Sequence, residues 1–108
     1  MRLGVLDVGS NTVHLQVFDA HPGARPSPST SHKVELRLTE YLDDQNNINP
    51  QGITALRDAI RGAVETAKSA GTEELLPFAT SALRESKNGS EIIKEINQEF
   101  EIDLQVLS

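Results

Sequence analysis

The sequence predicts an α/β domain built on a mixed five-stranded sheet, with its elements in the order β-β-β-α-β-α-β. Three observations support this fold class. Two short apolar runs are separated by a tight turn, a third stretch alternates apolar and charged residues, and two further strand-like segments each follow an amphipathic helix. Strands joined through helices run parallel, so the later strands should extend a sheet that a hairpin begins.

The first half of the chain predicts a hairpin and a third strand. Residues 3–8 form an apolar run typical of a buried strand, and residues 13–19 alternate as a second strand should. The short connection at 9–12 has the small polar residues of a hairpin turn. Residues 21–31 are rich in proline and glycine and are expected to form a loop, and residues 33–38 alternate as a third strand.

The next stretch predicts an exposed loop and a long helix. Residues 40–49 are acidic and rich in amides, which is typical of a solvated loop. Asn49 is a good helix cap, and Pro50 suits the first helical position because its missing N–H has no partner to lose there. Apolar residues then recur at helical spacing until Gly71, which is expected to terminate the helix.

The remaining segments complete the predicted sheet. Residues 75–80 indicate a fourth strand, in which Pro77 is tolerable near the start or at an edge. Asn88 and Glu91 resemble a capping pair in front of an amphipathic helix that continues to Phe100. The alternation in residues 102–106 predicts the fifth strand.

Composition limits the class of protein. The 108 residues, 37% of them hydrophobic, suffice for one domain, residues 1–108. Cysteine is absent, and neither a signal-peptide core nor a run of the ~20 apolar residues of a membrane helix is present, so we expect a cytoplasmic protein without a membrane partner. The net charge of −6 argues against nucleic acid, and it requires that any polyanion be held by local donors or a bound cation.

The first candidate site is the turn after the first strand. Gly9 lets the backbone approach an anion closely, and successive N–H groups in such a turn form an anion-binding concavity. Ser10, Asn11 and Thr12 continue the turn, with hydroxyl donors from Ser10 and Thr12. Asp7 cannot bind phosphate itself but could hold Mg²⁺, which would bridge to phosphate oxygens. A plain hairpin with a self-capping Asp7 and Asn11 is the alternative interpretation.

The second candidate site follows the fourth strand. Thr80 and Ser81 are small enough for close approach of a ligand, and Arg84 offers a planar, permanently charged phosphate donor. Open α/β sheets bind ligands beyond the carboxyl ends of parallel strands, where this segment should lie. Taken alone, the segment is better interpreted as an ordinary turn followed by a solvated arginine.

Two levels of resemblance connect these motifs. The order of elements resembles the ribonuclease-H-like half-domain of the superfamily that contains actin, hexokinase and acetate kinase. The residues L-D-V-G-S-N-T-V-H-L at 6–15 and A-T-S-A-L-R at 79–84 resemble the exopolyphosphatase and guanosine pentaphosphate phosphohydrolase family. The similarity continues through 33–38, the helix from Asn49 to Gly71 and the segment 103–108, and so covers essentially the whole chain.

The resemblance implies an enzyme that uses Mg²⁺ and water to release orthophosphate from inorganic polyphosphate. Asp7 would be the metal-associated carboxylate. Arg84 would stabilise charge in the transition state, and it would also contact phosphate. The other phosphate contacts would come from two short segments (Gly9, Ser10, Asn11, Thr12, Thr80 and Ser81).

The resemblance also marks departures. Thr39 stands where the family commonly has glycine, so only Arg37 is carried over from that stretch. The catalytic glutamate of the family follows the last strand, beyond Ser108, so residues 1–108 are expected to be an inactive fragment of a longer two-lobed enzyme. His14 is expected to have a packing or hydrogen-bonding role, and His21 and His32 have no partner spacing that indicates a metal site.

Alternatives remain open on sequence alone. Guanosine pentaphosphate could be the substrate in place of polyphosphate. The same turn could cradle the phosphates of ATP in a lobe of a sugar-kinase-like or acetate-kinase-like enzyme. A non-enzymatic interaction module, in which a sheet edge or the exposed face pairs with another copy in a homodimer or with another chain, is the third possibility.

Overall fold

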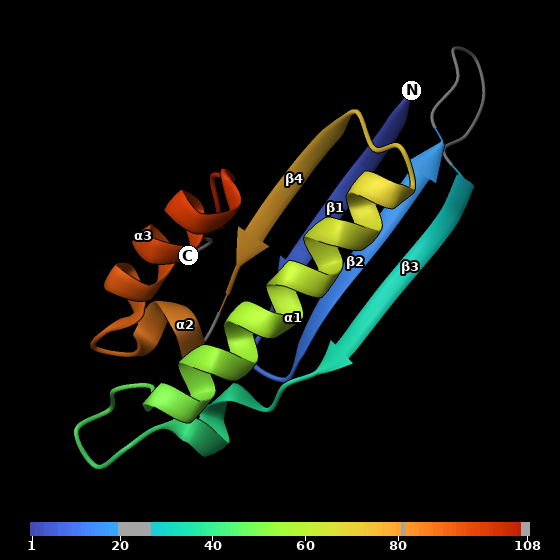
Figure 1. Ribbon diagram of the computed structural model, residues 1–108. Coiled ribbons are helices and arrows are strands. Elements are labelled where there is room, and N and C mark those ends of the chain that lie inside the picture. The colour runs from blue at the N-terminus through green and yellow to red at the C-terminus, as the bar shows by residue number, and fades with distance from the viewer. Residues whose placement is uncertain (20–26, 81, 107–108) are drawn as a thin grey trace.

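The computed structural model describes residues 1–19, 27–80 and 82–106, and it contains a five-stranded sheet in the order β3-β2-β1-β4-β5 (Figure 1). The β1–β2 and β2–β3 pairs are antiparallel, and the β1–β4 and β4–β5 pairs are parallel. The predicted mixed sheet and element order are confirmed. The strands are β1 (Arg2–Val8), β2 (Thr12–Asp19), β3 (Ser27–Glu35), β4 (Glu74–Ala79) and β5 (Gln105–Val106). The helices are the 3-10 helix η1 (Leu38–Tyr41), α1 (Pro50–Ser69), α2 (Ala82–Glu85) and α3 (Gly89–Phe100).

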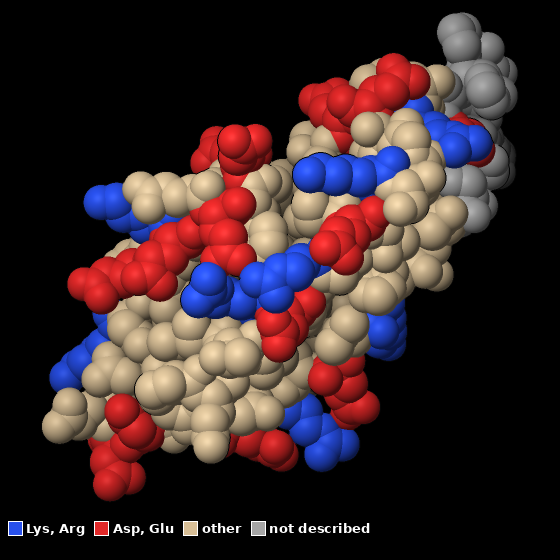
Figure 2. Space-filling view, in the orientation of Figure 1, with Lys and Arg blue, Asp and Glu red and all other residues tan. Residues whose placement is uncertain are grey.

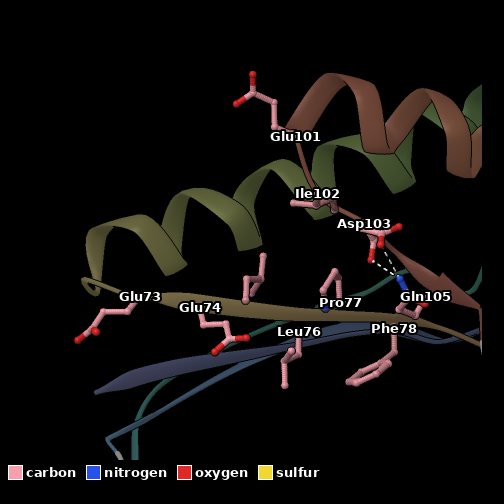
Figure 3. Close-up of a pocket in the computed structure, with 10 residues that line it drawn as sticks. Glu73, Glu74, Leu76, Pro77, Phe78, Glu101, Ile102, Asp103 and Gln105 are labelled. Carbon is pink, nitrogen blue, oxygen red and sulfur yellow. Dashed lines mark hydrogen bonds between the residues drawn. The ribbon is translucent and has the colours of Figure 1, made fainter.

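Both long helices lie on the same side of the sheet. α1 lies over β1 and β2 and runs along them, with α3 beside it, and an aliphatic core lies between the helices and the sheet (Figure 1). Leu76 and Phe78 of β4 point to the opposite side, whereas Pro77 points toward the helices (Figure 3). We call this opposite side the uncovered face. Alternation along the strands places Asp7 and His14 on it as well, because their chain neighbours are buried under α1.

The helical face has mixed charge. Acidic and basic side chains alternate over α1 and α3 (Figure 2). Glu99 of α3 pairs with Arg57 and Arg61 of α1, which lowers the pKa of its carboxyl, chiefly through the hydrogen bond from Arg57. Among the described helices, none combines the length and the apolar character that spanning a bilayer requires.

The third strand begins earlier than predicted. β3 starts at Ser27, so residues 27–31, expected as part of a loop, are in the sheet, and residues 20–26 lie outside the described residues. Pro28 is opposite Phe18 at an irregularity in the β2–β3 register. β3 is an edge strand, where a residue without an N–H is tolerated. The proline content therefore suggested a loop where the structure has an edge strand.

The segment after β3 also differs from the prediction. The strand ends at Glu35, and Arg37 adopts a left-handed conformation (φ 51, ψ 57) that turns the chain into η1. The stretch 40–49 is not simply an exposed loop, because Ile48 is only 2% exposed and pairs with Leu42 in an isolated bridge. A few apolar side chains thus fix an otherwise acidic stretch to the core.

The later elements match the prediction with three corrections. α1 begins at Pro50, capped by Asn49, whose side chain accepts from Gly52 N at 2.8 Å. β5 pairs with only Phe78 and Ala79, so Pro77 lies at a free edge of the sheet, as predicted. β5 is shorter than expected because Ile102 lies outside it, and the short helix α2 was not predicted.

The third correction concerns Asn88. It occupies the N-cap position of α3, but its side chain makes no capping hydrogen bond. Its Oδ1 instead accepts from Ile48 N at 2.8 Å, and its Nδ2 donates to Ile48 O at 2.9 Å. Asn88 therefore links α3 to the segment before α1, because its side-chain amide bonds to both backbone groups of Ile48 as a neighbouring strand would.

Replacing Asn88 with alanine should lower the free energy of unfolding by about 2 kcal/mol, because it leaves the N–H and C=O of buried Ile48 without partners. Urea denaturation followed by circular dichroism would measure this. Gln98→Ala, at an exposed position of the same helix, is the matched control and should change stability by less than about 0.5 kcal/mol. Equal losses in the two variants would show that the Asn88 contacts contribute little.

Candidate phosphate-binding site

The turn between β1 and β2 is held by backbone hydrogen bonds on one side. Gly9 N donates to Thr12 O at 2.9 Å, which closes the turn. The carbonyls of Ser10 and Asn11 accept from N–H groups of residues 36–38 at 2.7 to 3.0 Å. In a trans peptide the next N–H points opposite to the carbonyl, so the amides of Asn11 and Thr12 point away from residues 36–38. The turn is therefore fixed on one side and presents backbone donors on the other.

The end of β4 lies against this turn. Thr80 N donates to Val8 O at 3.1 Å, which continues the parallel β1–β4 pairing past the last strand residue. A Cβ placed on Gly9 would be 4.0 Å from Thr80 Oγ1 and 3.4 Å from Thr12 O. Gly9 and Thr80 therefore lie side by side at the carboxyl ends of two parallel strands. Ser81, the next predicted contact, lies outside the described residues.

Asp7 is exposed on the uncovered face, one residue before the end of β1. It is opposite His14 on β2 and Phe78 on β4. Within the described ranges, histidine, aspartate and glutamate side chains do not gather in any group of three or more that could hold a metal ion. Mg²⁺ commonly binds proteins through one or two carboxylates and completes its shell with waters and substrate phosphates. A single carboxylate beside the β1–β2 turn fits that mode.

Arg84 is at the same end of the sheet but on a separate element. α2 follows Thr80 closely and packs against η1, which itself follows the residues that hold the turn. The Arg84 side chain is 39% exposed, and its Nη2 lies 3.3 Å from a carboxylate oxygen of Glu85. The structure thus brings Gly9 and Thr80 into contact and places Arg84 nearby, with its guanidinium directed to a carboxylate of its own helix.

Sequence reasoning carried Arg37 over without a defined role and left Lys33 out of the site. Arg37 N donates to Asn11 O, and its side chain pairs with Glu35 at 2.9 Å and with Glu40 at 3.8 Å. The hydrogen bond to Glu35 and the charges of Glu35 and Glu40 raise the pKa of Arg37. The alternation of residues 33–38 indicated which face each side chain takes, but the left-handed conformation of Arg37 has no signal in the sequence.

The sheet order, the initial hairpin and the two helices on one face define a ribonuclease-H-like domain of the actin-like ATPase class. The chain belongs to the Ppx/GppA phosphatase family, whose model matches residues 16–108. The predicted family and fold are therefore confirmed.

Known proteins align with almost the whole chain. It is 46% identical over 107 residues to exopolyphosphatase 1 of Mycobacterium bovis, an alignment that covers 99% of this chain and 31% of that protein. The crystal structure of an exopolyphosphatase from Cytophaga hutchinsonii has 25% identity and a TM-score of 0.90, over 99% of this chain and 34% of that one. A Ppx/GppA family member from Aquifex aeolicus has a TM-score of 0.90 at 20% identity, over 99% of this chain and 35% of that one. The chain thus spans about a third of the length of these relatives.

Proposed function

We propose that residues 1–108 are the N-terminal phosphate-binding domain of an exopolyphosphatase-type phosphohydrolase. The observation that carries the proposal is the contact between the β1–β2 turn and the end of β4. Gly9 and Thr80 meet there, and turn amides point away from the residues that hold the turn. Backbone donors and hydroxyls at the carboxyl ends of parallel strands suit the terminal phosphate of a polyanion.

The proposed substrate is inorganic polyphosphate, from which the whole enzyme releases orthophosphate. The 46% identity with a protein named exopolyphosphatase 1 supports this substrate. Guanosine pentaphosphate is the second candidate, because the motifs at 6–15 and 79–84 resemble a family that includes guanosine pentaphosphate phosphohydrolases, and the chain belongs to the Ppx/GppA phosphatase family. Both substrates end in a phosphoanhydride, which the turn would hold in the same way.

Asp7 is proposed to hold Mg²⁺, which would neutralise part of the phosphate charge. The domain needs such a counter-cation because its net charge of −6 repels a polyanion. Gly9, Ser10, Asn11, Thr12, Thr80 and Ser81 would hold the phosphate through backbone and hydroxyl groups. Arg84 would turn from Glu85 toward the substrate and stabilise charge in the transition state, as positively charged groups do in phosphoryl transfer.

Catalysis by residues 1–108 alone is not expected. Hydrolysis needs a carboxylate that activates water in line with the scissile bond, and the resemblance places that glutamate after the last strand. Orthophosphate release from polyphosphate should therefore be negligible for this chain and substantial for the family-length enzyme. Robust turnover by the chain alone would contradict this part of the proposal.

Replacing Thr12 with valine tests the turn directly. The change removes one hydroxyl donor and keeps a side chain that suits a strand, so tripolyphosphate affinity in Mg²⁺ should fall roughly tenfold while the fold is retained. Isothermal titration calorimetry would measure the affinity. The matched control is Thr54→Val, at an exposed position of α1, which should leave the affinity within about twofold. If wild-type protein binds no oligophosphate, or if the two variants bind alike, the proposed site is wrong.

A further inference from the structure

A row of charged and polar residues crosses the uncovered face beside the turn. The strand registers place Asp7 opposite His14, and His14 opposite Lys33. Directly opposed residues of antiparallel strands share a face, with Cβ atoms about 5 Å apart. His32, the neighbour of Lys33, is on the other face, because a Cβ on Gly62 of α1 would be 3.3 Å from its Nε2. Asp7, His14 and Lys33 therefore follow one another from β1 to β3.

A hollow lies at the β3 end of this row. It has a volume of ≈ 410 Å³, and it is lined by Asn11, Thr12, Lys33 and Glu35. Asn11 and Thr12 belong to the turn proposed to bind phosphate. The hollow therefore adjoins that site directly and extends it toward β3.

The charges in this hollow favour an anion. Glu35 is paired with Arg37, whose Nε lies 2.9 Å from its carboxylate, so its negative charge is offset in part, although Arg37 also lies 3.8 Å from Glu40. The side chain of Lys33 has neither a hydrogen bond nor an ion pair with any residue that the structure describes. Its ammonium group is thus an available cation at the border of the turn.

The groove on the β4 side of the sheet has an acidic lining. A groove of ≈ 490 Å³ runs along the free edge of β4, and Glu73, Glu74, Glu101 and Asp103 are among the residues that line it (Figure 3). Carboxylates at these positions would repel a phosphate chain. Of these two hollows, the one lined by Lys33 is therefore the better suited to a linear polyanion that leaves the turn.

We propose that Lys33 and the adjoining hollow form a second anion subsite, which binds the phosphate group next to the one held by the turn. The substrate class is a linear oligophosphate, running from the turn across β2 to β3. This proposal rests on the proposed function and adds a direction for the chain. It makes Lys33 a residue that senses chain length, because a single phosphate in the turn would not reach it.

Calorimetric titrations with orthophosphate and with tripolyphosphate, both in Mg²⁺, test the subsite. Lys33→Gln should weaken tripolyphosphate binding about fivefold, the upper range for an exposed charge pair, and should leave orthophosphate binding within about twofold. Lys33→Arg should retain most of the tripolyphosphate affinity. Lys94→Gln on α3 makes the same change of net charge on the helical side and should affect neither ligand beyond about twofold.

The outcomes distinguish the second subsite from an effect of net charge, from the first site and from a failure of the proposed function. Equal losses of tripolyphosphate affinity in Lys33→Gln and Lys94→Gln would overturn the subsite, because net charge alone would explain them. An equal loss of orthophosphate and tripolyphosphate affinity in Lys33→Gln would also overturn it, because Lys33 would then belong to the first site. Failure of wild-type protein to bind either ligand would instead refute the proposed function.

Discussion

Replacing Gly89 with alanine is expected to lower the free energy of unfolding by about 3 kcal/mol. A Cβ at this position would lie 1.9 Å from Leu83 O and 2.7 Å from Ser86 Oγ, and Gly89 is buried. The nearest obstacle is a backbone carbonyl, which cannot move without displacing α2. Leu83 is only 1% exposed, so moving α2 would also disturb the core.

Gly62→Ala is the matched control for this substitution. Gly62 lies inside α1, and its added Cβ would be 3.3 Å from the end of the His32 side chain, which can shift slightly. Alanine is favoured over glycine in a helix by up to about 1 kcal/mol, so this variant should be as stable as the wild type or more stable. Urea denaturation would compare the two. Similar stabilities would mean that α2 and α3 move apart at little energetic cost.

The order of elements was predictable because each element has a local signal. The periods of two and of about three and a half residues distinguish strands from helices, and Asn49, Pro50 and Gly71 mark the limits of α1. Short connections and the crossover rule then leave few topologies. Local sequence patterns were therefore sufficient to predict the order of the elements in the fold.

The errors arose where distant residues decide the structure. Residues 27–31 form a strand because the length of β2 gives them a partner, which their proline-rich composition does not reveal. Asn88 bonds to Ile48, 40 positions earlier in the chain, in place of capping its own helix. η1 depends on the burial of Leu38 under α1. None of these contacts has a local pattern.

The site was predictable in its parts and less so in its arrangement. The small residues at 9–12 and at Thr80 indicated close backbone approach, and the structure brings Gly9 and Thr80 together. The register that aligns Asp7, His14 and Lys33 could not be read before the strands were paired. The roles of all these residues in binding stay predictions.

Replacing Asp7 with asparagine should have the largest effect on ligand binding, and its sign should depend on Mg²⁺. With Mg²⁺, tripolyphosphate affinity should fall roughly 10- to 100-fold, because the carboxylate that holds the counter-cation is lost. Without Mg²⁺, affinity should stay the same or rise, because an exposed negative charge beside the anion has been removed. Calorimetry with and without the metal would measure both values.

Asp44→Asn supplies the control for net charge. Asp44 is an exposed residue of the acidic stretch before α1, and its replacement removes the same unit of charge without touching the turn. It should change affinity by less than about twofold under either condition. A loss of tripolyphosphate affinity in Asp7→Asn without Mg²⁺ would show that Asp7 acts by orienting the turn and not through a cation. Identical binding by wild type, Asp7→Asn and Asp44→Asn would favour the interaction-module alternative, since the carboxylate at the strand end would then have no part in holding a ligand.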